Sequence, residues 1–480
     1  MKILLVNPPS GELTMGLKHL SKVEPLGLEI IGASVPDHEV RLLDMELDTD
    51  LAGALERFQP DVVGASSQIV QTYTARRVLN TAKDFNPNIL TLVGGHHASL
   101  FPQDFNAPYI DAIVLGEGVP AFQEIVARRR QHRDFTDVAG LALPTDGVLH
   151  FTPPRPLPRS LDHQPLPNRA LTAAYRSRYF YLFESPVASI QTSMGCTFPC
   201  NFCSCQKFTN RRFIPRSPEL IVEDLSRIQE KFVLFCDDHS FIDAQRMERL
   251  HDLIVERGIH KHYFVYSRAD CVVQNPALFE KWARIGVEIV MTGLEAVDDS
   301  DMNSLNKRSN VEINERALEI LHRCGVGVSA GFVVLPDFTE QDFERIDRYV
   351  NARPTIVLTE LTPLTPLPGT DLYLERKDSV LTDHREVYDL AHFVIPTALP
   401  QQELYRLLRK YYWRVVWRAI KRLRLYRPRY AFKPHMIGLI FGALRVAMMM
   451  RQAHQVSHSP IPADFNNTEE RHIKPRNGIQ

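Results

Sequence analysis

The chain has 480 residues, of which 44% are hydrophobic and 24% are charged, and its formal net charge is −1. These ordinary globular values allow large cores in two or three domains. We expect neither a secretion signal nor a membrane span. The N-terminal MKILLVNPPS reads directly as a strand, and the longest apolar stretch, residues 436–450, is short and interrupted by Arg445. We therefore predict a cytoplasmic protein.

Residues 1–130 alternate apolar runs with helical patterns. The expected strands are 3–8, 38–45, 61–67, 88–95 and 110–118, and the expected helices are 25–35, 51–58, 72–85 and 119–129. Strands that alternate with helices predict a parallel sheet covered on both faces. The first domain is therefore predicted to be a doubly wound, Rossmann-like α/β fold.

The carboxyl ends of these strands are rich in small and polar residues. Ligands of parallel α/β sheets bind at this edge, and glycine there lets a large ligand approach the backbone closely. The candidate ligand-binding residues of this edge are Ser66, Ser67, Gln68, Gly94, Gly95, His96, Gly116, Glu117 and Gly118.

The middle of the chain contains a linker and a second α/β domain. Residues 131–185 are rich in proline, which favours an extended, semi-rigid connector. From 186 to 375 the alternation of strands and helices resumes. Six strands with crossover helices fit a partial (β/α)6 barrel, in which active groups sit at the carboxyl ends of the strands. These strands are expected at 186–193, 232–238, 263–269, 287–296, 326–336 and 355–363.

Cys196, Cys200 and Cys203 follow the first of these strands with the spacing Cys-x3-Cys-x2-Cys. Three thiolates on one short loop reach a single 4Fe–4S cluster, which normally takes four cysteines, so one iron is left open. The alternatives are a structural zinc site with Cys205 as fourth ligand, or unligated thiols. Zinc sites usually pair two separated Cys-x2-Cys knuckles, whereas these thiols crowd into ten residues. An odd total of seven cysteines also argues against a disulfide framework.

With Phe202 directly before the last cysteine, the motif resembles that of the radical S-adenosylmethionine (SAM) superfamily. There the open iron binds SAM and delivers the electron that cleaves it to a 5′-deoxyadenosyl radical. A doubly wound domain directly upstream resembles the cobalamin-binding branch, in which that domain lays the corrin ring across its strand ends. The resemblance implies cobalamin, SAM and a 4Fe–4S cluster as cofactors. It also implies that residues 66–68, 94–96 and 116–118 hold cobalamin.

The loop after the first strand departs from the pattern of many cobalamin proteins. Those proteins supply a lower cobalt ligand from Asp-x-His-x-x-Gly, whereas residues 7–16 contain no histidine. Members of the radical SAM branch commonly lack this ligand, which implies an unligated or water-bound lower face. The alternatives are ligation by His96 or His97, or a domain that binds no corrin and serves as a scaffold.

Polar residues also close the strands of the predicted barrel. Asp237 and Asp238 end the second strand, Arg268 ends the third, and Gly293 and Glu295 end the fourth. The segment 293–295 resembles the Gly-x-Glu segment that holds SAM in cobalamin-type members. A carboxylate there pairs with the SAM ammonium or bonds the ribose hydroxyls. Each polar side chain is alternatively a solvated strand end or a helix cap.

Residues 376–454 are predicted to form a basic helical region, followed by a polar, disordered tail at 455–480. Residues 404–463 contain thirteen Lys and Arg but no Asp or Glu. Residues 404–425 place apolar side chains at helical spacing among these cations. That pattern fits a helix that caps the substrate site, a helix that lies on an anionic membrane surface, or a nucleic-acid patch. No known RNA-binding module is present, so we expect no nucleic-acid partner.

Over about residues 1–375 the architecture resembles a class B radical SAM methyltransferase. That implies methyl transfer to an unactivated carbon, with a flavodoxin- or ferredoxin-type reductant as partner. Residues 23–35 are similar to the hopanoid C-3 methylase branch, which implies an apolar, terpenoid-like small molecule as substrate and suits contact with the inner membrane surface. The alternatives are an anaerobic oxidative cyclase of the magnesium-protoporphyrin ester type and a non-enzymatic cobalamin or iron–sulfur sensor.

Overall fold

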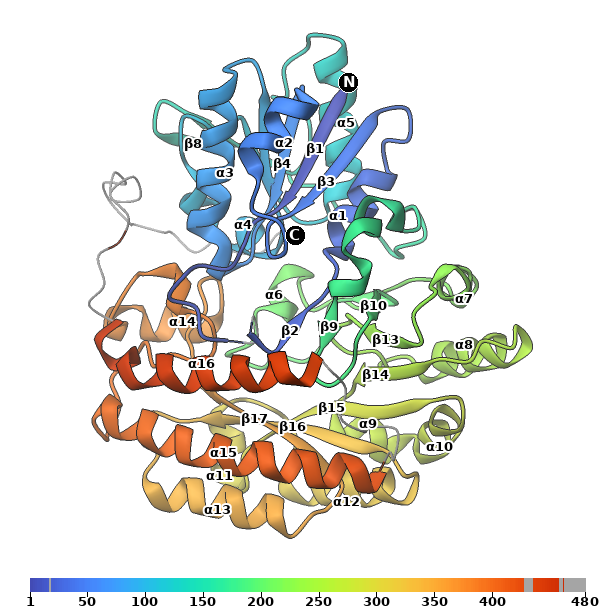
Figure 1. Ribbon diagram of the computed structural model, residues 1–480, viewed down its shortest axis with the longest axis vertical. Helices are drawn as coiled ribbons and strands as arrows, with labels where there is room; N and C mark the ends of the chain where they lie inside the picture. The colour runs from blue at the N-terminus through green and yellow to red at the C-terminus, as the bar shows by residue number, and fades with distance from the viewer. Residues whose placement is uncertain (17–18, 427–434, 457–460, 462–480) are drawn as a thin grey trace.

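The computed structural model describes residues 1–16, 19–426, 435–456 and 461. The N-terminal domain forms the upper half of Figure 1, and a second α/β domain forms the lower half. Two long helices, α15 (Gln401–Tyr426) and α16 (His435–Val456), lie side by side across the lower half. The expected tail at 455–480 lies almost entirely outside the described residues.

The N-terminal sheet has the strand order β3-β1-β4-β5-β6-β7-β8. Along β1, Leu4 and Val6 pack into the core on one face, and Ile3 and Leu5 pack into the core on the other, because successive side chains of a strand point to opposite faces. The predicted doubly wound fold is confirmed. The parallel strands are β1 (Lys2–Asn7), β3 (Glu39–Asp44), β4 (Val62–Ser66), β5 (Leu90–Gly94) and β6 (Ala112–Val114), with the helices α1 (Leu26–Ala33), α2 (Leu51–Phe58), α3 (Thr72–Phe85) and α5 (Gly118–Arg130).

This sheet extends past residue 130, where the sequence placed a domain boundary. β7 (Leu141–Thr145) and β8 (Val148–Phe151) form a hairpin that adds two antiparallel strands to the edge of β6. Leu141 and Ala142 are fully buried, so the hairpin covers an edge that would otherwise be exposed. The proline-rich run begins only after this hairpin. The linker prediction for residues 131–185 is therefore wrong for its first third.

The second domain holds a six-stranded, fully parallel sheet in the order β10-β13-β14-β15-β16-β17. Strands that occur in chain order across a parallel sheet with crossover helices confirm the partial (β/α)6 barrel. The strands are β10 (Val187–Ile190), β13 (Phe232–Phe235), β14 (His262–Tyr266), β15 (Val287–Glu295), β16 (Gly327–Val334) and β17 (Ile356–Pro363). The main crossover helices are α7 (Pro218–Arg227), α8 (Ala244–Glu256), α10 (Pro276–Arg284), α12 (Val311–Arg323) and α13 (Glu340–Asn351).

Buried ion pairs fasten the N-terminal domain to the linker and the barrel. The carboxylate of Glu24 is fully buried, accepts a hydrogen bond from Arg169 Nη1 at 2.8 Å, and pairs with Arg176. Arg169 also reaches Asp224 of α7, with 3.1 Å between Nη2 and Oδ2. Charges that are buried must be paired, so these residues fix how the two domains meet.

The basic helix α15 packs on the barrel through its charges. Lys410 Nζ lies 2.9 Å from Glu340 Oε1, Arg414 Nη1 lies 2.8 Å from Asp347 Oδ2, and Arg418 pairs with the same aspartate. The acidic side chains all belong to α13. Part of the positive charge in the C-terminal region therefore serves packing. Among the described residues, no helix is long and apolar enough to cross a membrane.

Candidate active site between the two sheets

A cavity of about 1120 Å³ lies between the two domains. It is larger than the roughly 300–1,000 Å³ of pockets for drug-sized ligands. The carboxyl ends of β4, β5 and β6 form one wall, and residues next to the cysteine motif form another. The helices α15 and α16 close a third side through residues such as Tyr412, Trp413, Val446 and Met450.

All nine residues predicted at the strand ends of the first sheet line this cavity. Gly95 adopts a φ of +104°, and a Cβ there would lie 2.9 Å from the backbone N and O of Ser67. The same two loops are joined by a hydrogen bond from Ser67 N to Gly94 O of 2.8 Å. Only glycine fits this backbone. The glycine therefore lets the 66–68 and 94–96 loops pack closely together at the edge of the sheet that lines the cavity.

The two neighbouring histidines face different surroundings. His96 lines the cavity, its Nε2 lies 3.0 Å from Ser204 Oγ, and its ring stacks on Phe208. His97 is 4% exposed, and its Nε2 lies 2.7 Å from Asp104 Oδ2. Burial lowers the pKa of both imidazoles. His97 also lines the cavity, but its Nε2 is engaged by Asp104, so His96 is the better placed of the two to meet a ligand.

The carboxylate of Glu117 is already engaged. It accepts hydrogen bonds from Gln164 Nε2 at 3.1 Å and from the backbone N of Val119 at 3.3 Å, and it lies 3.1 Å from His163 Nε2. These contacts hold the linker against the start of α5. Glu117 nevertheless lines the cavity, and the role of the 116–118 loop in cofactor binding stays a prediction.

The three motif cysteines lie on a loop that follows β10 and the short strand β11 (Ser193–Met194). Burial raises the pKa of the Cys196 and Cys200 thiols. A hydrogen bond from Cys205 lowers the pKa of Cys203 to about 7. The cysteines themselves do not line the cavity, but Ser204 and Cys205 do. The motif therefore opens toward the cavity through its last turn.

The arrangement of the thiols bears on the zinc alternative. Among the described residues, no three Cys, His, Asp or Glu side chains converge on a single metal ion. A structural zinc ion needs four such ligands around one point. A 4Fe–4S cluster binds each thiolate to a different iron, so its ligands surround a larger object. Three thiolates on one loop fit the protein ligands of a cluster in which one iron is left open.

Asp237 and Asp238 hold the start of the cysteine loop. Asp237 accepts hydrogen bonds from Thr192 N at 2.7 Å and Ser193 N at 2.9 Å, and Asp238 accepts one from Gly195 N at 2.7 Å. Burial raises the pKa of Asp237. Both amides donate to Oδ1 of Asp237, and Thr192 Oγ1 donates to Oδ2 at 2.5 Å. The protein itself therefore occupies both oxygens of this carboxylate, which argues against its predicted contact with SAM. Asp238 keeps an exposed side.

Arg268 contacts the cysteine loop. Its guanidinium lies 3.6 Å from the ring centroid of Phe198, within the motif, and pairs with Asp270 at 3.0 Å. It also donates to the backbone O of Lys307 at 3.0 Å. A guanidinium on an aromatic face is a stabilising contact. These contacts give Arg268 a positioning role where the sequence suggested direct SAM binding.

Glu295 ends β15 and lies in a buried ion pair with Lys307, with 2.6 Å between Oε1 and Nζ. A Cβ on Gly293 would lie 2.0 Å from Glu295 Oε1 and 2.9 Å from Lys307 Nζ, so glycine leaves room for the pair. The sequence pattern singled out Gly293 and Glu295 but not Lys307. That lysine is 12 residues farther along the chain, in a loop without a recognisable motif.

Comparisons with known proteins agree with this geometry. The B12 binding domain family matches residues 13–126, and the Radical SAM superfamily matches residues 190–350. Hopanoid C-3 methylase of Methylococcus capsulatus is 32% identical over 418 residues, which are 84% of this chain and 78% of that protein. The chain belongs to the cobalamin-binding radical SAM methyltransferases. Members of this family are enzymes, so the sensor alternative does not hold.

Two further comparisons show the range of similar proteins. Anaerobic magnesium-protoporphyrin IX monomethyl ester cyclase of Rubrivivax gelatinosus is 29% identical, over 71% of this chain and 62% of that protein. The solved structure of the methyltransferase TsrM from Kitasatospora setae, with cobalamin and a 4Fe–4S cluster bound, has a TM-score of 0.64 at 16% identity. That match covers 80% of this chain and 79% of the other. Cobalamin, SAM and a 4Fe–4S cluster are the cofactors of this protein.

Proposed function

We propose that this protein transfers a methyl group from SAM to an unactivated carbon of an apolar small molecule bound in the cavity between its two sheets. The observation that carries this proposal is the mostly apolar lining of that cavity. Water is excluded by apolar walls, which favours an apolar substrate and protects radical chemistry from side reactions. The apolar side chains of the far wall are Trp413, Val416, Ala443, Val446, Ala447 and Met450.

The chain's own residues divide the work of binding and orientation. Cys196, Cys200 and Cys203 would hold the cluster, the 66–68, 94–96 and 116–118 backbones would hold cobalamin, and Glu295 would orient SAM. When bound, these groups supply the adenosyl radical and the methyl group. The glycine turn at Gly95 keeps the ligand edge of the first sheet bare. The Asp237 hydrogen bonds fix where the cysteine loop leaves the barrel.

A terpenoid-like substrate is proposed from two observations. The relative with 32% identity is named a hopanoid methylase, and the lining of the cavity is mostly apolar. A flavodoxin- or ferredoxin-type protein is proposed as the electron donor, because reduction of the cluster needs a one-electron partner.

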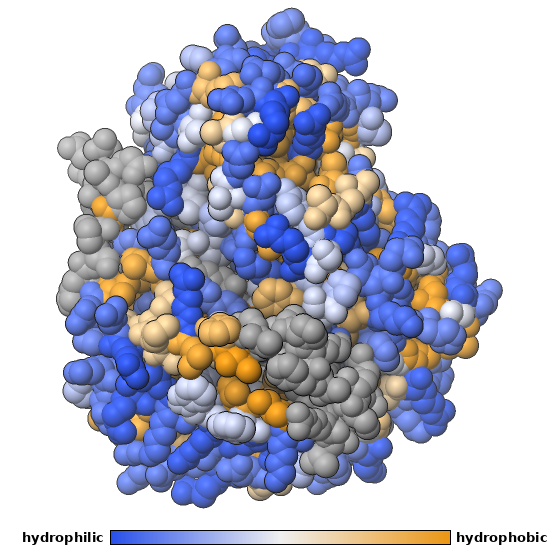
Figure 2. Space-filling view, viewed as in Figure 1, coloured by the Kyte–Doolittle hydropathy of each residue, from blue (hydrophilic) through white to orange (hydrophobic). Residues whose placement is uncertain are grey.

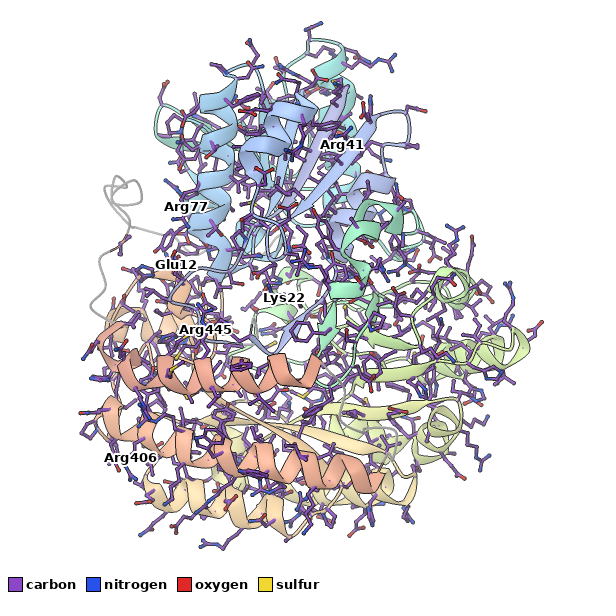
Figure 3. All side chains as sticks on the ribbon, in the orientation of Figure 1. Glu12, Lys22, Arg41, Arg77, Arg406 and Arg445 are labelled. Carbon is purple, nitrogen blue, oxygen red and sulfur yellow. The ribbon has the colours of Figure 1, made fainter. Side chains whose placement is uncertain are left out.

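Contact with a membrane surface is proposed through the exposed side of α15 and α16. Trp417 is 71% exposed, Phe441 is 66% exposed and Met448 is 59% exposed. Figure 2 shows apolar side chains gathered over α16, and Figure 3 labels Arg406 and Arg445 on the two helices. Aromatic and apolar side chains among cations suit an anionic lipid surface. The test is sedimentation with vesicles that contain anionic lipid, compared with purely zwitterionic ones.

The proposed reaction is tested by anaerobic turnover with cobalamin, reductant and SAM that carries a deuterated methyl group. A crude membrane lipid extract serves as the substrate pool, and the Cys200→Ser variant is the matched control. We expect deoxyadenosine, S-adenosylhomocysteine and a labelled apolar product, all absent in the control. Deoxyadenosine with an unlabelled, oxidised product would instead support cyclase chemistry. The proposal would be contradicted if neither deoxyadenosine nor a labelled product formed with this lipid pool present, from protein whose cluster and cobalamin have been verified.

A further inference from the structure

Arg409 of α15 is a cation in the mostly apolar wall that the C-terminal helices give to the cavity. It is half-buried and lines the cavity together with Tyr412, Trp413 and Val416. These four residues are spaced i, i+3, i+4 and i+7, so they form one stripe along the helix. Arg409 therefore belongs to the face of α15 that meets the cavity.

The packing of α15 on the barrel does not account for this arginine. Lys410, Arg414 and Arg418 form a second stripe, spaced i, i+4 and i+8, and they pair with the acidic side chains of α13. Lys22 also lines the cavity, but its ammonium donates to a backbone carbonyl. Within the described part of the chain, Arg409 has no ion pair and no hydrogen bond. Its guanidinium is therefore left for a partner from outside the protein.

The carboxylates of the cavity wall do not neutralise Arg409. Among the described residues, the acidic ones that line the cavity are Glu24, Glu46, Glu117 and Asp389. Each of them is already engaged, in turn by Arg169, by Ser10 Oγ, by Gln164 Nε2 and by the backbone N of Met15. A ligand that fills the cavity displaces water from Arg409, and a charge that loses its water needs a partner. The lining therefore favours a ligand that brings its own negative charge.

We propose that Arg409 binds a carboxylate of the substrate while the apolar walls take the rest of the molecule. A planar guanidinium matches a carboxylate with two parallel hydrogen bonds. The substrate is therefore an amphipathic molecule with an apolar body and one acidic end. The wall formed by the C-terminal helices is separate from the strand ends predicted to hold cobalamin, which leaves its cation to the substrate. This inference rests on the proposed function, because it names the chemistry of the substrate.

The first test uses two probes that share a polycyclic apolar body, 1-pyrenebutyrate with a carboxylate and 1-pyrenebutanol with a hydroxyl. Dissociation constants are measured by equilibrium dialysis on the full chain loaded with its cluster and cobalamin. We expect wild type to prefer the carboxylate, and this preference to fall about tenfold in Arg409→Met. That is the lower end for a hydrogen bond to a charged group, because Arg409 is only half-buried. Arg409→Lys, which keeps the charge, should retain most of the preference.

The matched control is Lys421→Met, which removes an exposed cation of the same helix that does not line the cavity and should keep the full preference. An equal preference in wild type and Arg409→Met would overturn the inference. Weaker cobalamin binding in Arg409→Met, with the probe preference unchanged, would assign the cation to the cofactor and also overturn it. Arg409→Gln replaces Arg409→Met in the same comparison if the methionine variant does not hold its cluster and cobalamin.

A turnover experiment separates this inference from the proposed function. The membrane lipid extract is divided by anion exchange into an acidic and a neutral fraction, and each is incubated with SAM that carries a deuterated methyl group. We expect labelled product from the acidic fraction, and about tenfold less of it from Arg409→Met. Label from the neutral fraction alone would leave the proposed function standing and overturn the Arg409 assignment. No label from either fraction would contradict the proposed function, while the probe preference, which needs no turnover, decides whether Arg409 selects an anion.

Discussion

The salt bridge between Asp104 and Arg385 joins the N-terminal domain to the C-terminal region, and Asp104→Asn should break it. Arg385 Nε lies 2.6 Å from Asp104 Oδ2, and Nη2 lies 3.1 Å from Oδ1. The two side chains are 2% and 5% exposed. His97 contacts the same carboxylate. A bidentate pair in this setting is among the stronger polar contacts of a protein.

The expected loss in the free energy of unfolding follows from the pKa of the Asp104 carboxylate. Burial alone would raise the pKa of Asp104, but the charge of Arg385 and the His97 contact outweigh it and lower the pKa from 3.8 to about 2. A shift of that size corresponds to roughly 2–3 kcal/mol. Because the folded-state pKa is depressed, this stability is present above pH 4 and is lost as the pH falls through 2. Removing the carboxylate also leaves the buried Arg385 guanidinium with the longer contact to Asp383, at 3.5 Å from Nη1, as its remaining ion pair. We therefore expect the free energy of unfolding to fall by about 3 kcal/mol.

This salt bridge bears on the candidate site because residues 386–389, which follow Arg385, bind the loop at residues 13–15, and that loop lies at the edge of the cavity. Glu386 accepts a hydrogen bond from Leu13 N at 3.0 Å, and Asp389 accepts one from Met15 N at 2.6 Å. Native-state hydrogen exchange, read by mass spectrometry, should show faster exchange of residues 384–392 in Asp104→Asn. The control Asp137→Asn, in an exposed pair with Arg128, should leave that peptide unchanged. Unchanged protection of residues 384–392 in Asp104→Asn would refute the reasoning.

Three further outcomes are expected. Gly95→Ala should weaken cobalamin binding in an absorbance titration at least tenfold, because of its φ of +104° and the close Ser67 backbone. Gly147→Ala should not, because this glycine also has a positive φ, +78°, but lies in the turn between β7 and β8 and does not line the cavity. Burial, with the nearby charge of Glu24, raises the pKa of Glu29 from 4.5 to about 8. Between these two pH values the folded protein holds a proton that the unfolded chain has lost, so the free energy of unfolding of wild type should fall as the pH rises from 4.5 to 8. Above pH 8 this contribution should no longer change. Glu29→Gln should remove that pH dependence in urea unfolding, and an equally steep dependence in the variant would contradict the assignment. Cys205→Ser should still assemble the iron–sulfur cluster, since three thiolates suffice, and loss of the cluster absorbance would make Cys205 a ligand.

The sequence predicted both sheets because each carries a local signal. Apolar runs that alternate with helical patterns mark β1 to β6, and the spacing of Cys196, Cys200 and Cys203 needs no structure to be recognised. The strand-end residues 66–68 and 94–96 were predicted for the same reason, since the end of a parallel strand is readable from the chain. The hairpin at 141–151 was missed because its strands are short and lie next to a proline-rich run, which dominated the local signal.

Contacts between distant residues were not predictable. His96 meets Ser204 across 108 residues, and Asp104 meets Arg385 across 281. Asp237 and Glu117 carry the residue type expected of a ligand, but backbone amides and linker side chains already occupy their oxygens. Only the folded chain shows which polar groups are satisfied and which remain for a ligand. Lys307 could not be predicted, because no motif surrounds it in the sequence and its partner, Glu295, lies at the end of β15.

The placement of the cavity follows from how the two sheets face each other. Each parallel sheet collects its functional loops at the carboxyl ends of its strands. Here the ends of β4 to β6 share one cavity with Gln191 after β10 and Leu367 after β17. A reaction that needs groups held by both domains requires such a shared volume. The C-terminal helices complete it, since Trp413 and Met450 close the side that neither sheet covers. Neither domain alone would enclose the substrate, which explains why buried charges such as Glu24 and Asp104 fix the junction.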